Sequence, residues 1–159
     1  MRLWIVRHGK ALQSSPTGSD FDRPLMTRGE SQARWLGEHI AGKKKRPDLI
    51  LTSGLARAIA TAKLIHQHLK CDLEVVRELE TGRSVSDALA LIAKHQSRGR
   101  LMLVGHNPTL GELVWTLKHG LPPREAELRT GQAYIFEFDE EVGPGKGRVH
   151  KVLRMDDLD

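Results

Sequence analysis

The stretch Leu3-Trp4-Ile5-Val6-Arg7-His8-Gly9 joins an apolar run of strand length to a cationic tripeptide. A continuous apolar run that contains Trp, Ile and Val and is bounded by charge is typical of a strand buried on both faces. Two further runs of this kind are Leu49-Ile50-Leu51 and Leu101-Met102-Leu103-Val104, and a weaker one extends from Leu73 to Val76. The sequence therefore predicts four strands of a buried sheet.

Segments of helical length lie between these runs. Thr27-Arg28-Gly29-Glu30 has the residues of a capping box, and apolar residues at helical spacing follow it up to Ile40. Leu55 to Leu69 has one apolar face, and Ser84-Val85-Ser86-Asp87 opens a third helix. Asn107-Pro108 supplies an N-cap and a first-turn proline for a fourth helix. This alternation of strands and helices favours a mainly parallel sheet with helices on both faces.

The C-terminal part has a different pattern. Ala133 to Phe138 and Arg148 to Leu153 look like strands, joined by the turn-rich Gly143-Pro144-Gly145-Lys146-Gly147. We therefore predict an α/β fold of three layers, α/β/α. It has a mainly parallel sheet with helices on both faces and a C-terminal antiparallel hairpin, in a single domain over residues 1–159.

Composition excludes several classes of protein. With 39% hydrophobic and 28% charged residues, the chain has the balance of a soluble globular protein. No export signal is visible, and no apolar stretch approaches the roughly 20 residues that span a bilayer. Cys71 is the single cysteine, so no internal disulfide forms and a cytoplasmic location is expected. The formal net charge of +5 predicts an anionic partner without identifying it.

Cationic and polar residues follow the predicted strands at the edge where a parallel sheet binds its ligands. Arg7-His8-Gly9 follows the first strand, and Thr52-Ser53-Gly54 follows the second, with Arg57 one helical turn further on. Gly105-His106-Asn107-Pro108 follows the Leu101 to Val104 run. Guanidinium groups match phosphate oxygens, and helix N-termini offer N–H groups to the same anion. The sequence therefore predicts an anion site with two histidines and two arginines.

His8 can do more than bind an anion. Cationic neighbours and a helix N-terminus lower the pKa of an imidazole and keep it neutral, and neutral imidazole is a nucleophile. Phosphoryl transfer would then form a phosphohistidine enzyme that water hydrolyses. The arginines and His106 would offset the charge of the transferring group, so neither a metal nor another cofactor is needed. Glu78 is the candidate general acid, and Glu80 is its close rival.

Each of these residues also has a structural interpretation. His8 and Arg7 could end a strand, His106 could be a hydrogen-bonded histidine beside a helix, and Arg57 and Glu78 could be solvated.

Three other features favour structural roles. The basic run Lys43-Lys44-Lys45-Arg46 complements a helix C-terminus, so we do not expect nucleic acid as a partner. Trp35 and Trp115 lie at helical spacing from apolar residues and are predicted to be core. The long loops Lys10 to Met26 and Gly120 to Gln132 are of a length that is often functional.

Taken together, the motifs resemble the histidine phosphatase superfamily, with its phosphoglycerate mutase-like fold, and its short SixA-like phosphohistidine phosphatase branch. The Arg-His-Gly motif of the family matches Arg7-His8-Gly9, and its Asp-x-Arg-Pro-Leu segment matches Asp20 or Asp22 through Arg23-Pro24-Leu25. Its Ser-Pro-x-x-Arg-Ala-x-x-Thr-Ala motif matches Ser53 to Ala62, and its second histidine matches His106.

The resemblance implies roles for these residues. His8 would be the phosphorylated nucleophile, Arg7 and Arg57 the phosphate clamp, and His106 the stabiliser of the transferring group. The Glu-x-x-x-Gly context favours Glu78 over Glu80 as the acid. The predicted substrate-binding residues are Arg7, Arg57, Arg23, Gly9 and Asn107.

The resemblance also suggests a substrate class. Larger members carry a helical insertion that encloses the site, whereas Arg83 to Gln96 is all that is available here. An open pocket suits a phosphate carried by a protein, such as a phosphohistidine-bearing signalling protein. The alternatives are a small-molecule phosphomonoesterase with the same site and a non-catalytic module that binds a phosphorylated partner. Gly54 and Met26 stand where the family usually has proline and often has threonine, which affects substrate preference more than chemistry.

Overall fold

Six strands form one sheet in the computed structural model, which describes residues 1–155. Residues 156–159 of the predicted domain lie outside the described residues. The strand order is β3-β2-β4-β1-β5-β6, so β1 and β4 lie at the centre. The strands are β1 (Arg2–Arg7), β2 (Leu49–Thr52), β3 (Asp72–Val75), β4 (Arg100–Gly105), β5 (Gln132–Glu137) and β6 (Arg148–Arg154).

The sheet is parallel over its first four strands. β1 pairs with β4 so that Leu3 lies opposite Leu101, and β2 pairs with β4 and β3 in the same direction. β5 runs antiparallel to β1, with Phe136 opposite Leu3, and β6 runs antiparallel to β5. The predicted mainly parallel sheet with a C-terminal antiparallel hairpin is confirmed.

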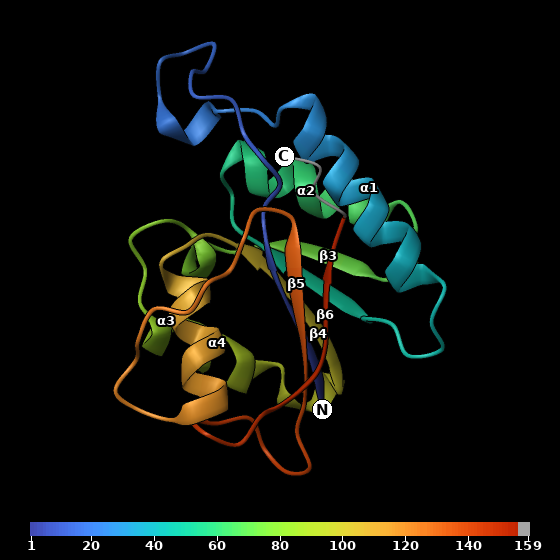
Figure 1. Ribbon diagram of the computed structural model, residues 1–159, viewed down its shortest axis with the longest axis vertical. Coiled ribbons are helices and arrows are strands. Elements are labelled where there is room, and N and C mark those ends of the chain that lie inside the picture. Colours follow the sequence, from blue (N-terminus) through green and yellow to red (C-terminus); the bar gives the residue numbers. More distant parts are fainter. Residues whose placement is uncertain (156–159) are drawn as a thin grey trace.

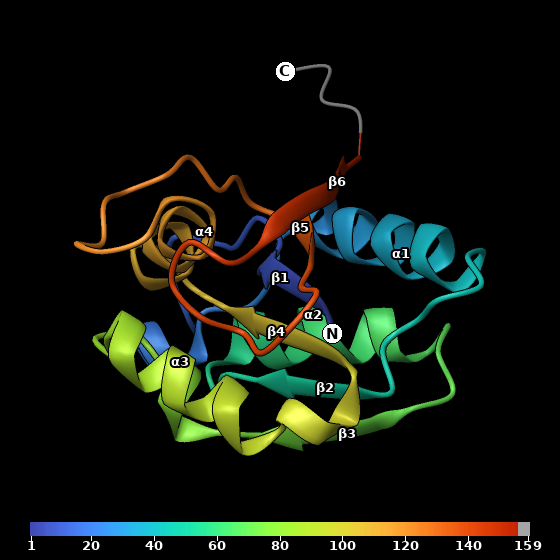
Figure 2. The same cartoon turned by 90° about the horizontal axis from the view of Figure 1, so that it is seen from below.

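Four helices cover the two faces of the sheet (Figures 1 and 2). Buried side chains form two clusters, one on each face, because successive strand residues point in opposite directions. Leu3 and Ile5 pack towards α3 and α4, whereas Trp4 and Val6 pack towards α1 and α2. The predicted three-layer arrangement is therefore confirmed. The helices are α1 (Thr27–Ala41), α2 (Ala56–His66), α3 (Val85–Lys94) and α4 (Thr109–His119).

The starts of two helices differ from their predicted form. Thr27 is not the N-cap of α1, because Met26 holds that position without a side-chain cap. The Met26 N–H instead donates to the Lys10 carbonyl, so pairing with the segment after β1 fixes the start of this helix. At α4 the N-cap is Pro108, while Asn107 Oδ1 still accepts a hydrogen bond from the Gly111 N–H, 3.2 Å away. α3 has the full capping box at its predicted start.

Trp35 and Trp115, predicted to be core residues, are half-buried rather than fully buried, and Trp35 packs against the buried cluster on the α1 and α2 face. Each contacts a histidine one turn later on its own helix. Trp35 stacks on His39 with ring centroids 3.8 Å apart, and Trp115 is tilted against His119 with ring centroids 4.3 Å apart. None of the helices within residues 1–155 combines the length and the apolar character needed to cross a membrane.

Candidate active site

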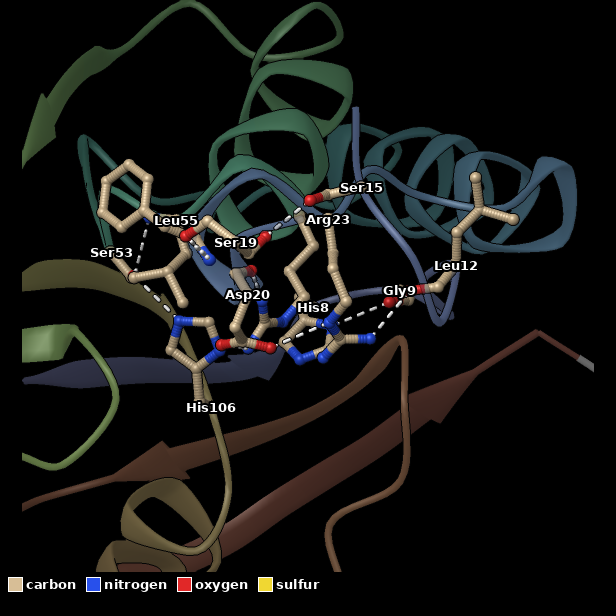
Figure 3. Close-up of polar contacts among 12 residues, drawn as sticks. His8, Gly9, Leu12, Ser15, Ser19, Asp20, Arg23, Ser53, Leu55 and His106 are labelled. Carbon is tan, nitrogen blue, oxygen red and sulfur yellow. Dashed lines mark hydrogen bonds and ion pairs between the residues drawn. The ribbon is translucent and has the colours of Figure 1, made fainter. Parts of the chain in front are cut away.

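The predicted site residues meet at the carboxyl ends of β1, β2 and β4. Because β4 lies between β1 and β2, the segments that follow these strands converge. The ring centroids of His8 and His106 are 5.1 Å apart (Figure 3). A pocket of about 420 Å³ opens here, and we call it the phosphate pocket. Its lining includes Arg7, His8, Arg23, Arg57, His106 and Asn107.

His8 is held in one tautomer. Its Nδ1 lies 2.7 Å from the carbonyl oxygen of Gly9. A carbonyl oxygen accepts hydrogen bonds and cannot donate them, so Nδ1 carries the proton and Nε2 keeps its lone pair. Burial lowers the pKa of His8 to about 4, with a further contribution from the charges of Arg57 and Arg7. At neutral pH the ring is thus neutral and nucleophilic at Nε2.

The backbone around Gly9 fixes the position of this ring. The Gly9 N–H donates to Thr61 Oγ1 at 3.0 Å, and the Thr61 hydroxyl donates to the Arg57 carbonyl at 2.8 Å. A Cβ on Gly9 would lie 2.5 Å from the carbonyl oxygen of Gly29 in α1, which is closer than atoms can approach. Glycine is therefore required where the chain after His8 crosses the first turn of α1.

His106 is held by a side chain rather than by the backbone. Its Nε2 lies 2.8 Å from Ser53 Oγ, and that oxygen accepts a hydrogen bond from the Leu55 N–H at 3.1 Å. When the Ser53 hydroxyl donates to Nε2, the proton of the neutral ring is on Nδ1. This Nδ1 is buried and has no hydrogen-bond partner within residues 1–155. It is available to donate to an oxyanion in the phosphate pocket.

The pKa of His106 is lowered further than that of His8. Burial is the main cause of its fall to about 3, and the neighbouring His8 and Arg57 contribute through charge. Two neutral imidazoles in a pocket with arginines make a site that is positive because of its guanidinium groups.

Arg57 and Arg23 converge on an acidic residue, Asp20. Arg57 is buried, and its guanidinium donates to the Asp20 carbonyl at 2.9 Å and to Asp20 Oδ2 at 3.2 Å. Arg23 Nε donates to Asp20 Oδ1 at 2.8 Å. These two arginines, Arg23 first, hold the pKa of Asp20 below its usual range. Figure 3 shows the Asp20 carboxylate beside the rings of His8 and His106.

Sequence reasoning missed this role of Asp20. The residue entered as one of two acids that could match a motif, and no pattern in the sequence separates it from Asp22. The sequence feature that points to this role is the length of the loop between β1 and α1. The Leu12 N–H donates to the Pro24 carbonyl, so the two ends of the loop pair and Asp20 is brought back to the site.

Arg7 and Asn107 share one backbone partner. Arg7 donates to the Leu128 carbonyl at 3.2 Å, and Asn107 Nδ2 donates to the same oxygen at 2.7 Å. Burial and then the charges of Arg57 and Arg154 lower the pKa of Arg7. The second predicted long loop, which contains Leu128, thus forms part of the site.

Glu78 is a predicted site residue that does not line the phosphate pocket. It lies in a short 3-10 helix (Arg77–Leu79), and its Oε2 is 3.7 Å from Lys94 Nζ of α3. The residue of this segment that lines the pocket is Thr81. Its rival Glu80 lies closer to the end of β2, with Oε2 3.1 Å from where a Cβ on Gly54 would be. The geometry gives Glu78 no contact with the reacting groups.

The sequence and the fold of this chain are similar to those of known proteins. Residues 3–83 match the histidine phosphatase superfamily (branch 1). An uncharacterized protein of Picosynechococcus is 32% identical over 132 residues, which cover 81% of this chain and 80% of that protein. The phosphohistidine phosphatase SixA of Escherichia coli is 29% identical over 127 residues, covering 77% and 78% of the two chains. A solved structure of the protein histidine phosphatase SixA complexed with tungstate has a TM-score of 0.81 at 26% identity, covering 97% of each chain.

Proposed function

We propose, from the premise that this chain belongs to the histidine phosphatase superfamily and is a phosphatase, that it hydrolyses phosphohistidine on a protein. The resemblance of its motifs to the SixA-like branch is confirmed by the same comparisons. Two features support the finer proposal. The SixA relatives are named phosphohistidine phosphatase and protein histidine phosphatase. The segment between β3 and α3, which borders the phosphate pocket, is also short.

The short segment between β3 and α3 is the main structural support for this proposal. β3 ends at Val75 and α3 begins at Val85, and the short 3-10 helix Arg77–Leu79 is the one helical turn between them. This short segment contributes Thr81 to the pocket lining. A phosphorylated side chain that projects from a protein surface can therefore approach from the β3 side, where a tall wall would exclude the protein that carries it.

In the first step, the lone pair of His8 Nε2 attacks phosphorus. The P–N bond of the substrate breaks, and its electron pair stays on the imidazole of the substrate. That ring leaves as a neutral group if its other nitrogen was protonated beforehand. Throughout, Nδ1 of His8 keeps its proton and donates it in a hydrogen bond to the Gly9 carbonyl, which stabilises the positive ring of the phosphorylated enzyme.

In the second step, water attacks the same phosphorus. The bond from phosphorus to Nε2 breaks, and its electrons return to His8 as the lone pair. Both protons of the water leave with the phosphate, which releases one of them to solvent. Arg57, Arg7 and the Nδ1–H of His106 would meet the charge on the equatorial oxygens in both steps.

Hydrolysis of phosphohistidine does not require a carboxylic acid of the enzyme as general acid. A protonated imidazole is a good leaving group, so a phosphohistidine substrate needs no carboxylic acid in the position predicted for Glu78. An alkyl phosphate ester would need one, because its alkoxide leaves poorly without a proton.

The test is phosphate release from two substrates in the presence of EDTA. One is a protein phosphorylated chemically on histidine, and the other is p-nitrophenyl phosphate. We expect faster turnover of the phosphohistidine protein, and loss of release from both substrates in His8→Ala. Release mainly from p-nitrophenyl phosphate would instead identify a small-molecule phosphomonoesterase. Absence of release that depends on His8 from either substrate would leave a binding module.

A further inference from the structure

A second cleft continues from the phosphate pocket along the loop between α4 and β5. It has a volume of about 670 Å³, and we call it the flanking groove. The two cavities share Arg7, Lys10, Asn107 and Thr130 in their linings. The orange segment of Figures 1 and 2 is the loop that borders this groove. A ligand with its phosphate in the pocket has the flanking groove directly beside it.

The flanking groove is strongly cationic. Among the residues 1–155 that line it, two carboxylates, Glu125 and Glu127, are outnumbered by the cationic side chains. Positive charge gathered in a concave surface attracts anions more strongly than the same charge spread over a convex one. The cationic residues of the lining are Arg7, Lys10, Arg28, Arg129 and Arg154.

Hydrogen bonds join the loop that forms the wall of the flanking groove to the end of β1. Leu128 is buried, and its carbonyl accepts the hydrogen bonds from Arg7 and Asn107 described above. The Gly131 N–H donates to the carbonyls of Arg7 and His8 at 3.1 and 2.9 Å. The loop that carries Arg129 is thus fixed to β1 on both sides of that residue, which keeps the groove in register with the phosphate pocket.

We propose that the flanking groove binds an acidic stretch of the substrate protein that lies beside its phosphorylated residue. This inference rests on the proposed function, because it assigns the neighbour of the phosphate to a polypeptide. Lys10 and Arg129 are exposed, and Arg28 is half-buried, so they can meet carboxylates without the cost of burying a charge. Contacts of this kind raise the association rate and the selectivity for a partner of opposite charge.

The experiment compares two synthetic peptides that differ in the residues around one phosphohistidine. One has aspartates on both sides of it, and the other has serines. Hydrolysis is followed by phosphate release, and affinity is followed by fluorescence anisotropy of the labelled peptides on His8→Asn, which cannot turn them over. At low salt we expect kcat/KM and affinity to be about tenfold higher for the aspartate peptide, an advantage that rising salt removes.

A matched pair of variants locates the effect. Arg28→Gln with Arg129→Gln neutralises two charges in the flanking groove outside the phosphate pocket. Lys43→Gln with Lys44→Gln removes the same charge from the exposed run between α1 and β2, at the opposite end of the sheet. We expect the first pair to abolish the preference for aspartate and the second to keep it. Glu125→Gln with Glu127→Gln should strengthen the preference. Circular dichroism checks that all variants are folded, and turnover of p-nitrophenyl phosphate should stay within about twofold of the wild type.

The outcomes separate the two proposals. Equal affinity and equal kcat/KM for both peptides would overturn the flanking groove as a docking site, and so would an equal loss of preference in both neutralised pairs. Failure of the proposed function would appear differently, as no hydrolysis of either peptide by the wild type. The anisotropy comparison would then still decide whether the groove binds acidic polypeptide.

Discussion

The ends of β1 and β4 each deliver one histidine to the phosphate pocket, but they hold it by different means. After β1, a backbone atom orients the ring: the Gly9 carbonyl accepts a hydrogen bond from Nδ1–H of His8 and leaves the Nε2 lone pair available. After β4, the side chain of Ser53 contacts Nε2 of His106 and leaves Nδ1 buried without a partner. When the Ser53 hydroxyl donates to Nε2 of His106, the two identical side chains present a lone pair in one case and a proton donor in the other. The difference shows that the hydrogen-bond partner of a histidine, rather than the histidine itself, defines its role.

Replacing His8 should have the largest effect. His8→Asn removes the lone pair that attacks phosphorus, so we expect kcat to fall by more than about 10⁴-fold. Rapid acid-free quenching after addition of labelled substrate should trap a phosphorylated wild type and no phosphorylated variant. A labelled His8→Asn enzyme would show that another residue is the nucleophile.

The second histidine should matter less. His106→Asn replaces the donor of the ring with a shorter amide that does not fill the same position, but it keeps the nucleophile, so we expect kcat to fall by about 10²- to 10³-fold. The phosphorylated enzyme should still form, more slowly, in the same quench experiment. If both histidine variants failed to form it, the division of roles between the two strand ends would be wrong.

The glycines beside the two histidines give a comparison of stability. A Cβ on Gly9 would meet the Gly29 carbonyl oxygen at 2.5 Å, whereas a Cβ on Gly105 would meet the Leu79 carbonyl oxygen at 3.3 Å. We expect Gly9→Ala to lower the free energy of unfolding by about 1–3 kcal/mol and Gly105→Ala to lower it by less. Urea unfolding of both variants measures the difference. Equal losses would mean that the segment after β1 is no more tightly constrained than the segment after β4.

Removing the hydroxyl that holds His106 should have a smaller effect on turnover. Ser53→Ala leaves Nε2 of His106 without its partner, and we expect kcat/KM to fall by about tenfold. If Ser53 acts through His106, the double variant with His106→Asn should be no slower than His106→Asn alone. Additive losses in this cycle would instead give Ser53 a separate contact with substrate.

The smallest expected effect concerns protonation between pH 5 and 8. Both histidines have pKa values well below the ordinary 6.5, about 4 and about 3, so neither ring should titrate in this range in the folded protein. The unfolded chain binds these protons near pH 6.5. Stability therefore rises with pH between the folded and unfolded values and is lost as the pH falls towards 4. NMR titration of the imidazole C–H signals tests this, and a midpoint near 6.5 for either ring would contradict it.

Most of the fold is predictable because three of its central strands are buried on both faces. Such strands have continuous apolar runs, which is why β1, β2 and β4 stand out in the sequence. The helix start at Thr27 was predicted wrongly because a capping box is a local pattern. The actual partner of Met26 is the Lys10 carbonyl, which is distant in sequence.

The site was predictable where side chains follow strands and was not where other atoms or loops contribute. The Leu128 carbonyl that orients Arg7 is a backbone atom, and no residue type indicates it. Asp20 depends on how a long loop closes. Spacing to a glycine favours Glu78 over Glu80, but it does not show where either side chain points: Glu78 lies in the 3-10 helix and is directed to Lys94, whereas Glu80 is the C-cap of that helix.

The ion pair between Asp20 and Arg57 makes substrate binding an exchange of anions. Before substrate arrives, a carboxylate of the protein already holds one arm of this guanidinium and the Nε of Arg23. A tethered carboxylate competes at a high effective concentration, so singly charged ions such as chloride displace it poorly. A phosphoryl group, with two charges and three oxygens to offer both arginines, can take its place. Asp20 therefore favours exchange with a phosphoryl group over exchange with a singly charged ion at Arg57 and Arg23.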